Sequence, residues 1–211
     1  MKKVIPVIYA LSIDEFNEKL NKMAGFSKEF QVDIMDGAFV PEKSFDIVDL
    51  ESLPNDKDFE FHLMVSHPLD YIDHLKKLGV NRVVFHDEID EDTMSDIKAF
   101  KRDGFSVFLA INPKTEPANI QEYVDEVDGI LLMSVEPGRP GQELIPSVLA
   151  KAVWLRERHP NLIISMDGGI NKSNIGDVFE SGANIALVGS GILKAEDPAR
   201  EWEELSKMSN I

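Results

Sequence analysis

Eight short apolar runs recur along the chain, and amphipathic stretches separate most of them. The runs read KVIPVIYA, FQVDIMD, FEFHLMV, RVVFHDE, SVFLAIN, GILLMSV, LIISMDG and IALVGSG, with frequent β-branched residues. Strands that alternate with helices form parallel βα units, and eight such units close a (β/α)8 barrel. No linker rich in proline, glycine or serine interrupts the pattern, so we expect residues 1–211 to form a single TIM-barrel domain.

The stretches between the runs carry helix signals. Ser12 and Glu15 have the spacing of a capping box, and the apolar residues that follow fall on one helical face. Comparable faces follow the third, fifth, sixth, seventh and eighth runs, within residues 69–75, 120–127, 148–155, 175–179 and 202–205. Residues 42–56 are the weakest part of the pattern, and we expect one short helix there that ends near Pro54.

Composition restricts the classes of binding partner and the cellular compartment that this chain fits. The formal net charge of −16 argues against nucleic acid and anionic membranes, because both bind basic surfaces. Cysteine is absent, which excludes disulfides and thiolate metal sites. The opening MKKVIPVIYALS lacks a small-residue cleavage pattern and predicts a strand rather than a signal peptide. No apolar run reaches transmembrane length, so we expect a cytoplasmic protein.

Polar residues gather where the predicted strands end. They are Asp33, Asp36, His62, His86, Asn112, Glu136 and Asp167. Each alone is explained by a cap or a structural hydrogen bond. Because the carboxyl ends of barrel strands meet at one mouth, where catalytic groups lie, their convergence favours an active site.

Glycines and methionines form two further sets at the same ends. Glycine pairs in three successive loops favour a phosphate site, since glycine lets backbone N–H groups approach an anion, although a tight turn explains any single glycine. Arg139 would add a positive charge there. Three methionines would give the mouth an apolar lining for a reacting carbon, although methionine usually fills a core. The two sets are Gly138, Gly141, Gly168, Gly169, Gly189 and Gly191, and Met35, Met64 and Met133.

From residue 6 to residue 191 the chain resembles the ribulose-phosphate 3-epimerase family, which includes hexulose-phosphate 3-epimerases. The motifs are VDIMDGAFVP, FHLMVSHPLDYI, the His86 segment, INPKT, LLMSVEPGRPGQ, MDGGIN and VGS. The resemblance implies a TIM barrel that inverts C3 of a ketose phosphate, either ribulose 5-phosphate or a hexulose phosphate. It also implies a divalent metal (Zn, Fe, Mn or Mg), a small-molecule sugar phosphate as partner, and a homo-oligomer.

The resemblance also implies roles for individual residues. Asp33 and Asp167 match the acid/base pair, which also binds the metal, and His62 matches a metal-binding histidine. The expected substrate contacts are Met35, Met64 and Met133 around the reacting carbon, and Gly138, Gly141, Gly168, Gly169, Gly189 and Ser190 around the phosphate.

The chain departs from the family pattern at several of these positions. Gln31 stands where the family has its first metal-binding histidine, and an amide oxygen is a poorer ligand than imidazole for zinc or iron. We therefore expect weaker metal binding, with a shift towards Mg²⁺ or Mn²⁺. Val7 and Ala10 replace first-strand serines, Glu42 replaces the asparagine after FVP, and the residue after MSV is Glu136.

Two functions fit these residues, and a third is weighed and set aside. Epimerisation is favoured because both aspartates needed for proton transfer on opposite faces are present. The main alternative is a non-catalytic or metal-independent sugar-phosphate-binding barrel. A decarboxylase or aldol-type barrel needs an inward lysine, and Asp96-Ile97-Lys98 has that spacing but lies in a helical stretch.

Overall fold

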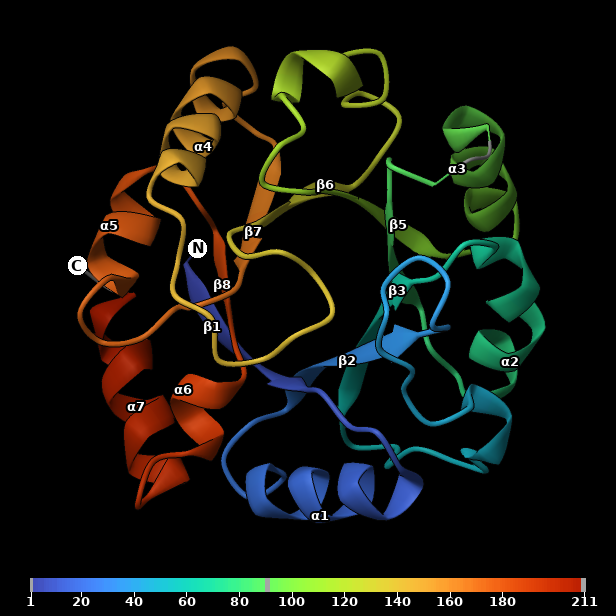
Figure 1. The fold of residues 1–211 in the computed structure, drawn as a ribbon, viewed down its shortest axis with the longest axis vertical. Helices are drawn as coiled ribbons and strands as arrows, with labels where there is room; N and C mark the ends of the chain where they lie inside the picture. Colours follow the sequence, from blue (N-terminus) through green and yellow to red (C-terminus); the bar gives the residue numbers. More distant parts are fainter. Residues whose placement is uncertain (1, 90–91, 210–211) are drawn as a thin grey trace.

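The computed structural model describes residues 2–89 and 92–209 and confirms the predicted (β/α)8 barrel. Eight parallel strands pair in sequence order, and β8 closes the sheet against β1 (Figure 1). The strands are β1 (Lys3–Ile8), β2 (Glu29–Met35), β3 (Asp58–Met64), β4 (Arg82–His86), β5 (Ser106–Ile111), β6 (Gly129–Met133), β7 (Ile163–Asp167) and β8 (Ile185–Val188). The single domain over residues 1–211 stays a prediction, because residues 1, 90–91 and 210–211 lie outside the described part.

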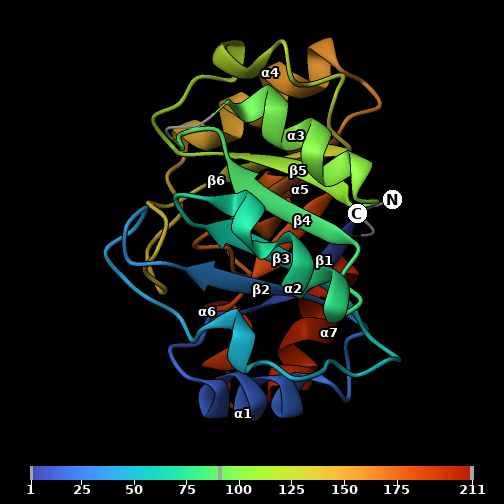
Figure 2. The same ribbon diagram turned by 90° about the vertical axis from the view of Figure 1, so that its right-hand side faces the viewer.

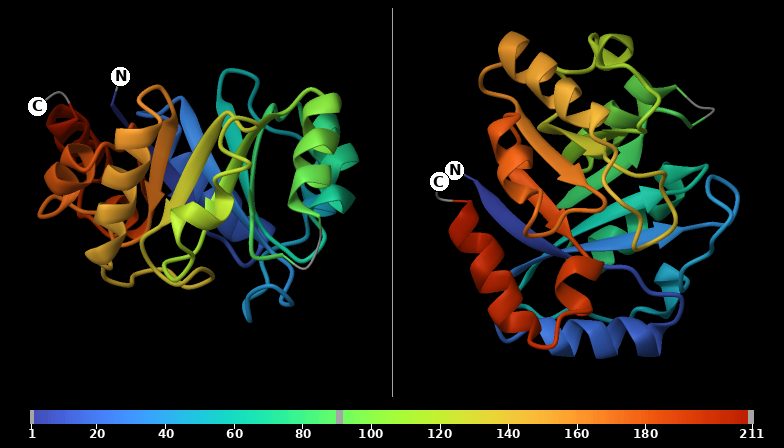
Figure 3. Two further views of the ribbon diagram at one scale, coloured as in Figure 1. Left: turned by 90° about the horizontal axis from the view of Figure 1, so that it is seen from above. Right: turned by 60° about the vertical axis from the view of Figure 1, so that its left-hand side comes forward.

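Helices surround the barrel, as the sequence pattern predicts for most of them. The helices are α1 (Ile13–Met23), α2 (Ile72–Lys77), α3 (Thr93–Arg102), α4 (Ser147–Arg158), α5 (Ile175–Glu180), α6 (Ser190–Leu193) and α7 (Pro198–Met208). The expected capping box is present, since Ser12 accepts from the backbone N–H of Glu15 and Glu15 accepts from that of Leu11. α7 lies beside β1 (Figure 3), and the indole N–H of Trp202 donates to the carbonyl of Val4. No described helix is long and apolar enough to span a bilayer.

Two helix predictions are wrong in type. The stretch 42–56 holds only the 3-10 turn η1 (Ile47–Asp49), and the stretch 120–127 follows the 3-10 turn η3 (Pro117–Ile120) without an α-helix. A third 3-10 turn, η2 (Pro68–Tyr71), precedes α2. The apolar residues in 120–127 are nevertheless buried, and successive i→i+3 hydrogen bonds place them inward. The spacing of the apolar residues indicates which side chains face the core. Consecutive 3-10 turns place such residues on the core side as well as an α-helix does.

Side chains alternate across each strand, so every second residue points into the barrel. The inward set is largely apolar and consists of Ile5, Val7, Val84, Phe108, Ala110, Leu131, Met133, Val135, Ile185 and Leu187. β2 and β3 differ, because at paired registers they carry the polar residues Gln31 and Glu60, followed by Asp33 and His62. These residues are joined by His86 on β4 and Asp167 on β7, so the polar side chains of the barrel interior come from several strands.

The polar side chains approach the end of the barrel where the strands terminate. Figure 2 shows the arrowhead of β2 pointing to this end, where the loops after β2 and β6 also lie. In Figure 1 the loop between β6 and α4 curves across the view of the barrel. This end is the mouth at which the sequence predicts the active site.

The barrel interior contains one position where a side chain has no room. Gly129 on β6 pairs with Phe108 on β5, and a Cβ atom added at Gly129 would lie 2.3 Å from Cε1 of Phe108. We expect Gly129→Ala to lower the free energy of unfolding by about 1–3 kcal/mol through overpacking. Gly176→Ala in α5 is the matched control, because a Cβ atom there meets nothing within 4 Å. Urea unfolding should show the control unchanged or stabilised by up to about 1 kcal/mol, and equal destabilisation of both variants would contradict this packing.

Candidate active site

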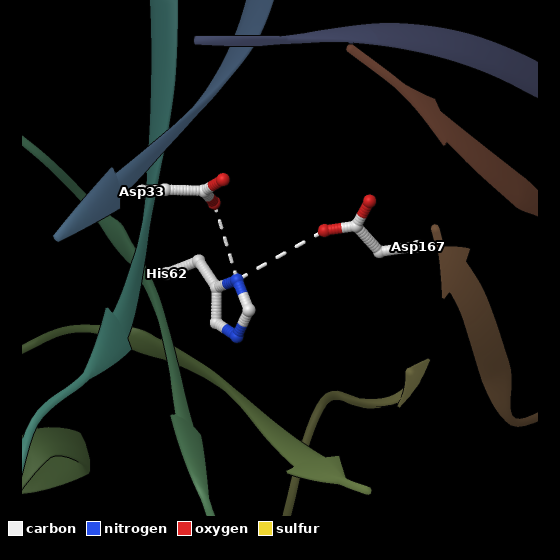
Figure 4. A group of neighbouring side chains, drawn as sticks. All are labelled: Asp33, His62 and Asp167. Carbon is white, nitrogen blue, oxygen red and sulfur yellow. Dashed lines mark hydrogen bonds and ion pairs between the residues drawn. The ribbon is translucent and has the colours of Figure 1, made fainter. Parts of the chain in front are cut away.

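Three side chains from three strands converge at the mouth (Figure 4). Asp33 on β2 and His62 on β3 are direct register partners, and Asp167 ends β7. Nδ1 of His62 lies 3.2 Å from Oδ1 of Asp33 and 4.0 Å from Oδ2 of Asp167. One ligand atom from each residue lies within 4.8 Å of the other two. The structure thus brings together the three residues that the sequence analysis placed at the centre of the site.

Gln31 joins this group from the same face of β2. It is fully buried, and its Nε2 donates to Oδ2 of Asp167 at 2.9 Å and to Oδ1 of Asp33 at 3.2 Å. Its Oε1 is buried without a hydrogen-bond partner. The amide therefore bridges the two carboxylates and leaves an unused acceptor, which is costly in a buried site.

Electrostatics in the group are dominated by two neighbouring carboxylates in a poorly solvated place. Burial and the charge of Asp33 raise the pKa of Asp167 to about 7, against smaller opposing effects of His62 and Gln31. Burial alone would lower the pKa of His62, but the hydrogen bond with Asp33 and the charges of both aspartates raise it overall. The group therefore retains protons near neutral pH that these side chains would otherwise lose.

The donor set fits a divalent cation. Two carboxylates and one imidazole are ligands for Zn²⁺, Fe²⁺, Mn²⁺ and, through oxygen, Mg²⁺. The three side chains are largely buried, with 0% exposure for that of His62, 10% for Asp33 and 13% for Asp167. Positive charge placed between the carboxylates would also relieve their repulsion. Asp33, His62 and Asp167 are therefore positioned to bind a divalent metal ion.

Two further residues continue the hydrogen-bonded chain from the ring nitrogen of His62 that faces away from the aspartates. Nε2 of His62 lies 2.9 Å from Nε2 of His86, and Nδ1 of His86 lies 3.2 Å from Oε2 of Glu88. Both imidazoles are fully buried, and burial lowers the pKa of His86 to about 4 despite the opposing effect of Glu88. His86 was predicted at a strand end without a role, and Glu88 was not predicted. The i, i+2 spacing of His86 and Glu88 at a strand end was the available signal.

A cavity of about 300 Å³ opens above these side chains. Met64 and Met133 line it, whereas Met35 is buried beside Val40 and Met64 and does not reach the lining. Every glycine loop predicted for phosphate does line it, through Gly138, Gly141, Gly168, Gly169, Gly189 and Ser190. Met35 is thus the one predicted substrate contact that the structure keeps away from the cavity.

Two of these glycines are also required by packing. A Cβ atom at Gly169 would lie 2.2 Å from the backbone N of Leu144, and one at Gly168 would lie 2.4 Å from Cγ2 of Val135. Both glycines have positive φ angles, of +120° for Gly168 and +66° for Gly169. The loop after β7 therefore needs glycine to pack against the loop after β6, independently of any ligand.

Two of the positively charged residues at the rim are held in ion pairs. Arg139 donates from Nε to Oε1 of Glu42 at 2.7 Å, which links the loops after β6 and β2. Lys114 pairs with Glu136 at 2.8 Å, and both side chains are exposed. Glu42 and Glu136, where the chain departs from the family pattern, are thus the ion-pair partners of Arg139 and Lys114. The guanidinium of Arg139 is therefore not free to bind an anion without competition from Glu42.

The remaining predicted positions have structural explanations. Oδ1 of Asp36 accepts from the backbone N–H groups of Ala38 and Phe39, as expected of a turn residue. Val7 lines the cavity, whereas Ala10 is buried in the outer core and does not. Lys98 lies on α3, outside the barrel, so it is not the inward lysine of an aldol-type site.

Comparison with known proteins agrees with the motifs. A model described as the ribulose-phosphate 3 epimerase family matches residues 3–193. Ribulose-phosphate 3-epimerase from Schizosaccharomyces pombe is 30% identical over 202 residues, which cover 93% of this chain and 89% of that protein. The protein of the same name from Bacillus subtilis is 30% identical over 213 residues, which cover 97% of this chain and 98% of that protein.

Solved structures share the fold at lower identity. 3-Hexulose-6-phosphate synthase from Salmonella typhimurium has a TM-score of 0.74 at 16% identity, covering 99% of this chain and 98% of that one. Tryptophan synthase from Mycobacterium tuberculosis has a TM-score of 0.74 at 11% identity, and the match covers 100% of this chain and 93% of that one. At these identities the likeness concerns the barrel alone.

The raised pKa of Asp167 has a consequence for stability. In metal-free protein the folded state holds a proton that the unfolded state has lost between the ordinary pKa of an aspartate and about 7. This group therefore makes the free energy of unfolding fall as pH rises through that range, by up to about 1.4 kcal/mol per pH unit. We expect Asp167→Asn to reduce the fall, measured by denaturant unfolding with a chelator from pH 4.5 to 7.5. An unchanged pH dependence would contradict the raised pKa.

Proposed function

The chain belongs to the ribulose-phosphate 3-epimerase family, and from that premise we propose that it inverts C3 of a ketose phosphate by proton transfer between Asp33 and Asp167. At the coarser level, the chain is a sugar-phosphate epimerase. A cytoplasmic location stays a prediction from the sequence pattern, and a homo-oligomeric state stays a prediction from the resemblance. The substrate is either a five-carbon or a six-carbon ketose phosphate.

The observation that supports the mechanism is the placement of the two carboxylates. Asp33 and Asp167 come from β2 and β7, which are not neighbours in the sheet, yet both face Nδ1 of His62 at the floor of the cavity. Inverting a carbon next to a ketone requires one group to remove its proton and another to return a proton on the opposite face. Two carboxylates approaching from separate strands meet that requirement.

The protonation of the pair suits this exchange. A general acid and a general base must coexist, so one carboxyl group has to carry a proton while the other is ionised. Burial and the charge of Asp33 raise the pKa of Asp167, which favours a single proton shared within the pair. Asp33 and Asp167 exchange these roles when the opposite epimer is bound.

Asp33, His62 and Asp167 would hold a divalent cation, with Gln31 as a fourth ligand. Turning the Gln31 amide by 180° would bring its unpartnered Oε1 to face the carboxylates, where Nε2 now donates. When bound, the cation would supply Lewis-acid stabilisation of the negative charge that develops on the substrate oxygen. Met64 and Met133 would border the reacting carbon, and the glycine loops would hold the phosphate at a fixed distance from it.

One observation favours the alternative, a metal-independent sugar-phosphate-binding barrel. The Gln31 amide already bridges Asp33 and Asp167 and so offsets part of their repulsion without a cation. In such a barrel the glycine loops would still bind the phosphate. Loss of proton transfer with retained ligand binding would characterise this function.

We expect the protein to exchange the C3 proton of ribulose 5-phosphate or a hexulose phosphate with solvent deuterium. Asp33→Asn and Asp167→Asn should each slow net inversion by about 10²–10⁴-fold, because each removes one proton-transfer group. Each variant should still exchange the proton of one epimer, and the two variants should retain opposite epimers. NMR of the substrate in D₂O measures both quantities.

Three outcomes of this experiment are informative. Retained exchange of opposite epimers supports proton transfer by two aspartates. Loss of all exchange in both variants contradicts the division of roles between them. Absence of exchange in the parent protein with all tested ketose phosphates and metals contradicts epimerisation and leaves the binding function.

We expect Gln31→His to raise the affinity for Zn²⁺ or Co²⁺ by at least about 10-fold, because imidazole is a better ligand than an amide for these ions. Gln31→Leu should weaken binding of Mn²⁺, which accepts an amide oxygen. Calorimetric titration of metal-free protein measures both affinities. Unchanged affinity in both variants would mean that Gln31 is not a ligand.

A further inference from the structure

We propose that Glu88, acting through His86, fixes the tautomer of His62 and thereby reserves Nδ1 of His62 for the proton or cation held between the two aspartates. Glu88 and His86 would be positioning residues, since neither lies among the residues that line the cavity. The inference rests on the proposed function only in taking the Asp33, His62 and Asp167 group as the place where that cation binds.

The chain of hydrogen bonds begins at a carboxylate whose orientation is fixed. Oε1 of Glu88 accepts from the backbone N–H of Asn112 at 2.7 Å and from the hydroxyl of Thr115. A backbone N–H can only donate, so the atom that faces Asn112 must be an acceptor. The other oxygen, Oε2, is left to face Nδ1 of His86 at 3.2 Å.

The second step sets the tautomer of His86. A neutral imidazole carries one N–H group, and the nitrogen that faces an ionised carboxylate has to be the donor. Nδ1 of His86 therefore holds the proton, and its Nε2 carries a lone pair. The buried ring of His86 is fixed between Phe39, at 4.7 Å between ring centroids, and His62, at 5.0 Å.

The third step reaches the site. Nε2 of His62 lies 2.9 Å from Nε2 of His86, and because that nitrogen of His86 carries a lone pair, His62 donates from Nε2. Nδ1 of His62 is then the nitrogen that remains, and it faces Oδ1 of Asp33 and Oδ2 of Asp167. Asp33 also favours a proton on Nδ1, so His62 satisfies both neighbours when both nitrogens are protonated, and the chain from Glu88 holds the Nε2 proton when Nδ1 gives up its own. A buried carboxylate partner behind a metal-binding histidine is a common way to orient the ligand.

The same geometry predicts that Glu88→Gln reverses the direction of proton donation along the hydrogen bonds from residue 88 through His86 to His62. The amide oxygen must stay at Asn112 to accept its N–H, so the amide NH₂ group faces His86 and donates to Nδ1. His86 then carries its proton on Nε2 and donates to His62, and neutral His62 has to carry its proton on Nδ1. That proton takes up the lone pair that Nδ1 of His62 would offer to a cation.

Nitrogen-15 NMR of the histidine rings in metal-free protein tests the inference directly. In the parent protein we expect His86 to be protonated at Nδ1, and neutral His62, above its pKa, at Nε2. In Glu88→Gln both rings should show the opposite tautomer. The parent spectrum alone is decisive if the variant does not fold, because His86 protonated at Nε2 would overturn the inference.

Mn²⁺ titration of the same proteins provides the second readout. We expect Glu88→Gln to weaken Mn²⁺ binding by about 10–100-fold, the usual effect of losing a residue that supports a metal ligand. Glu116→Gln is the matched control, with the same change of charge at an exposed position on the neighbouring loop after β5, and it should bind Mn²⁺ as the parent does. Equal affinity in Glu88→Gln and the parent would overturn the inference.

The outcomes are distinguishable from failure of the proposed function. If no ketose phosphate is epimerised but the tautomers and the Mn²⁺ affinity change as described, the positioning role of Glu88 stands without the activity. If the protein is an active epimerase and Glu88→Gln alters neither the histidine spectra nor Mn²⁺ binding, the activity stands and the role of Glu88 is wrong.

Discussion

The mutual repulsion of Asp33 and Asp167 is the constraint on which the site depends. Two carboxylates that converge in a poorly solvated barrel mouth cannot both be ionised without a compensating group. The chain supplies neutral or positive groups around them, with the Gln31 amide donating to both and His62 facing both. The local cost in stability is consistent with a functional pair, because a structural core would be better served by apolar side chains.

Barrel closure makes this arrangement possible. β2 and β7 are far apart in the sequence and are not paired, yet the ring of eight strands brings their ends to one mouth. The interior beneath is packed, with Phe108 filling the space over Gly129 and the buried side chains of Gln31 and Glu60 lying below the two aspartates and His62. The strands thus fix the positions of the carboxylates, while the loops after β6 and β7 shape the cavity above them.

The sequence predicted the barrel, and it placed Asp33, His62 and Asp167 together, because strand periodicity and strand ends are local properties. It did not predict Glu88, whose role depends on contacts with Asn112 and Thr115 on another loop. The sequence also predicted Met35 at the cavity. Alternation along a strand indicates which face a side chain lies on, but it does not indicate whether other residues cover that side chain. The α-helix predicted in residues 120–127 is a series of turns in the structure. The prediction was wrong because the spacing of apolar residues indicates which side chains are buried and not which backbone hydrogen bonds form.

The paired charges at the rim affect how a substrate arrives. Arg139 and Lys114 are each neutralised by an acidic partner, and the chain as a whole carries a formal charge of −16. A phosphorylated sugar therefore approaches against a repulsive overall field, and the N–H groups of the loops and Lys194, which lines the cavity, attract it only at short range. Added salt screens that field, so the encounter rate should rise with ionic strength, opposite to the behaviour of sites that guide anions by positive charge.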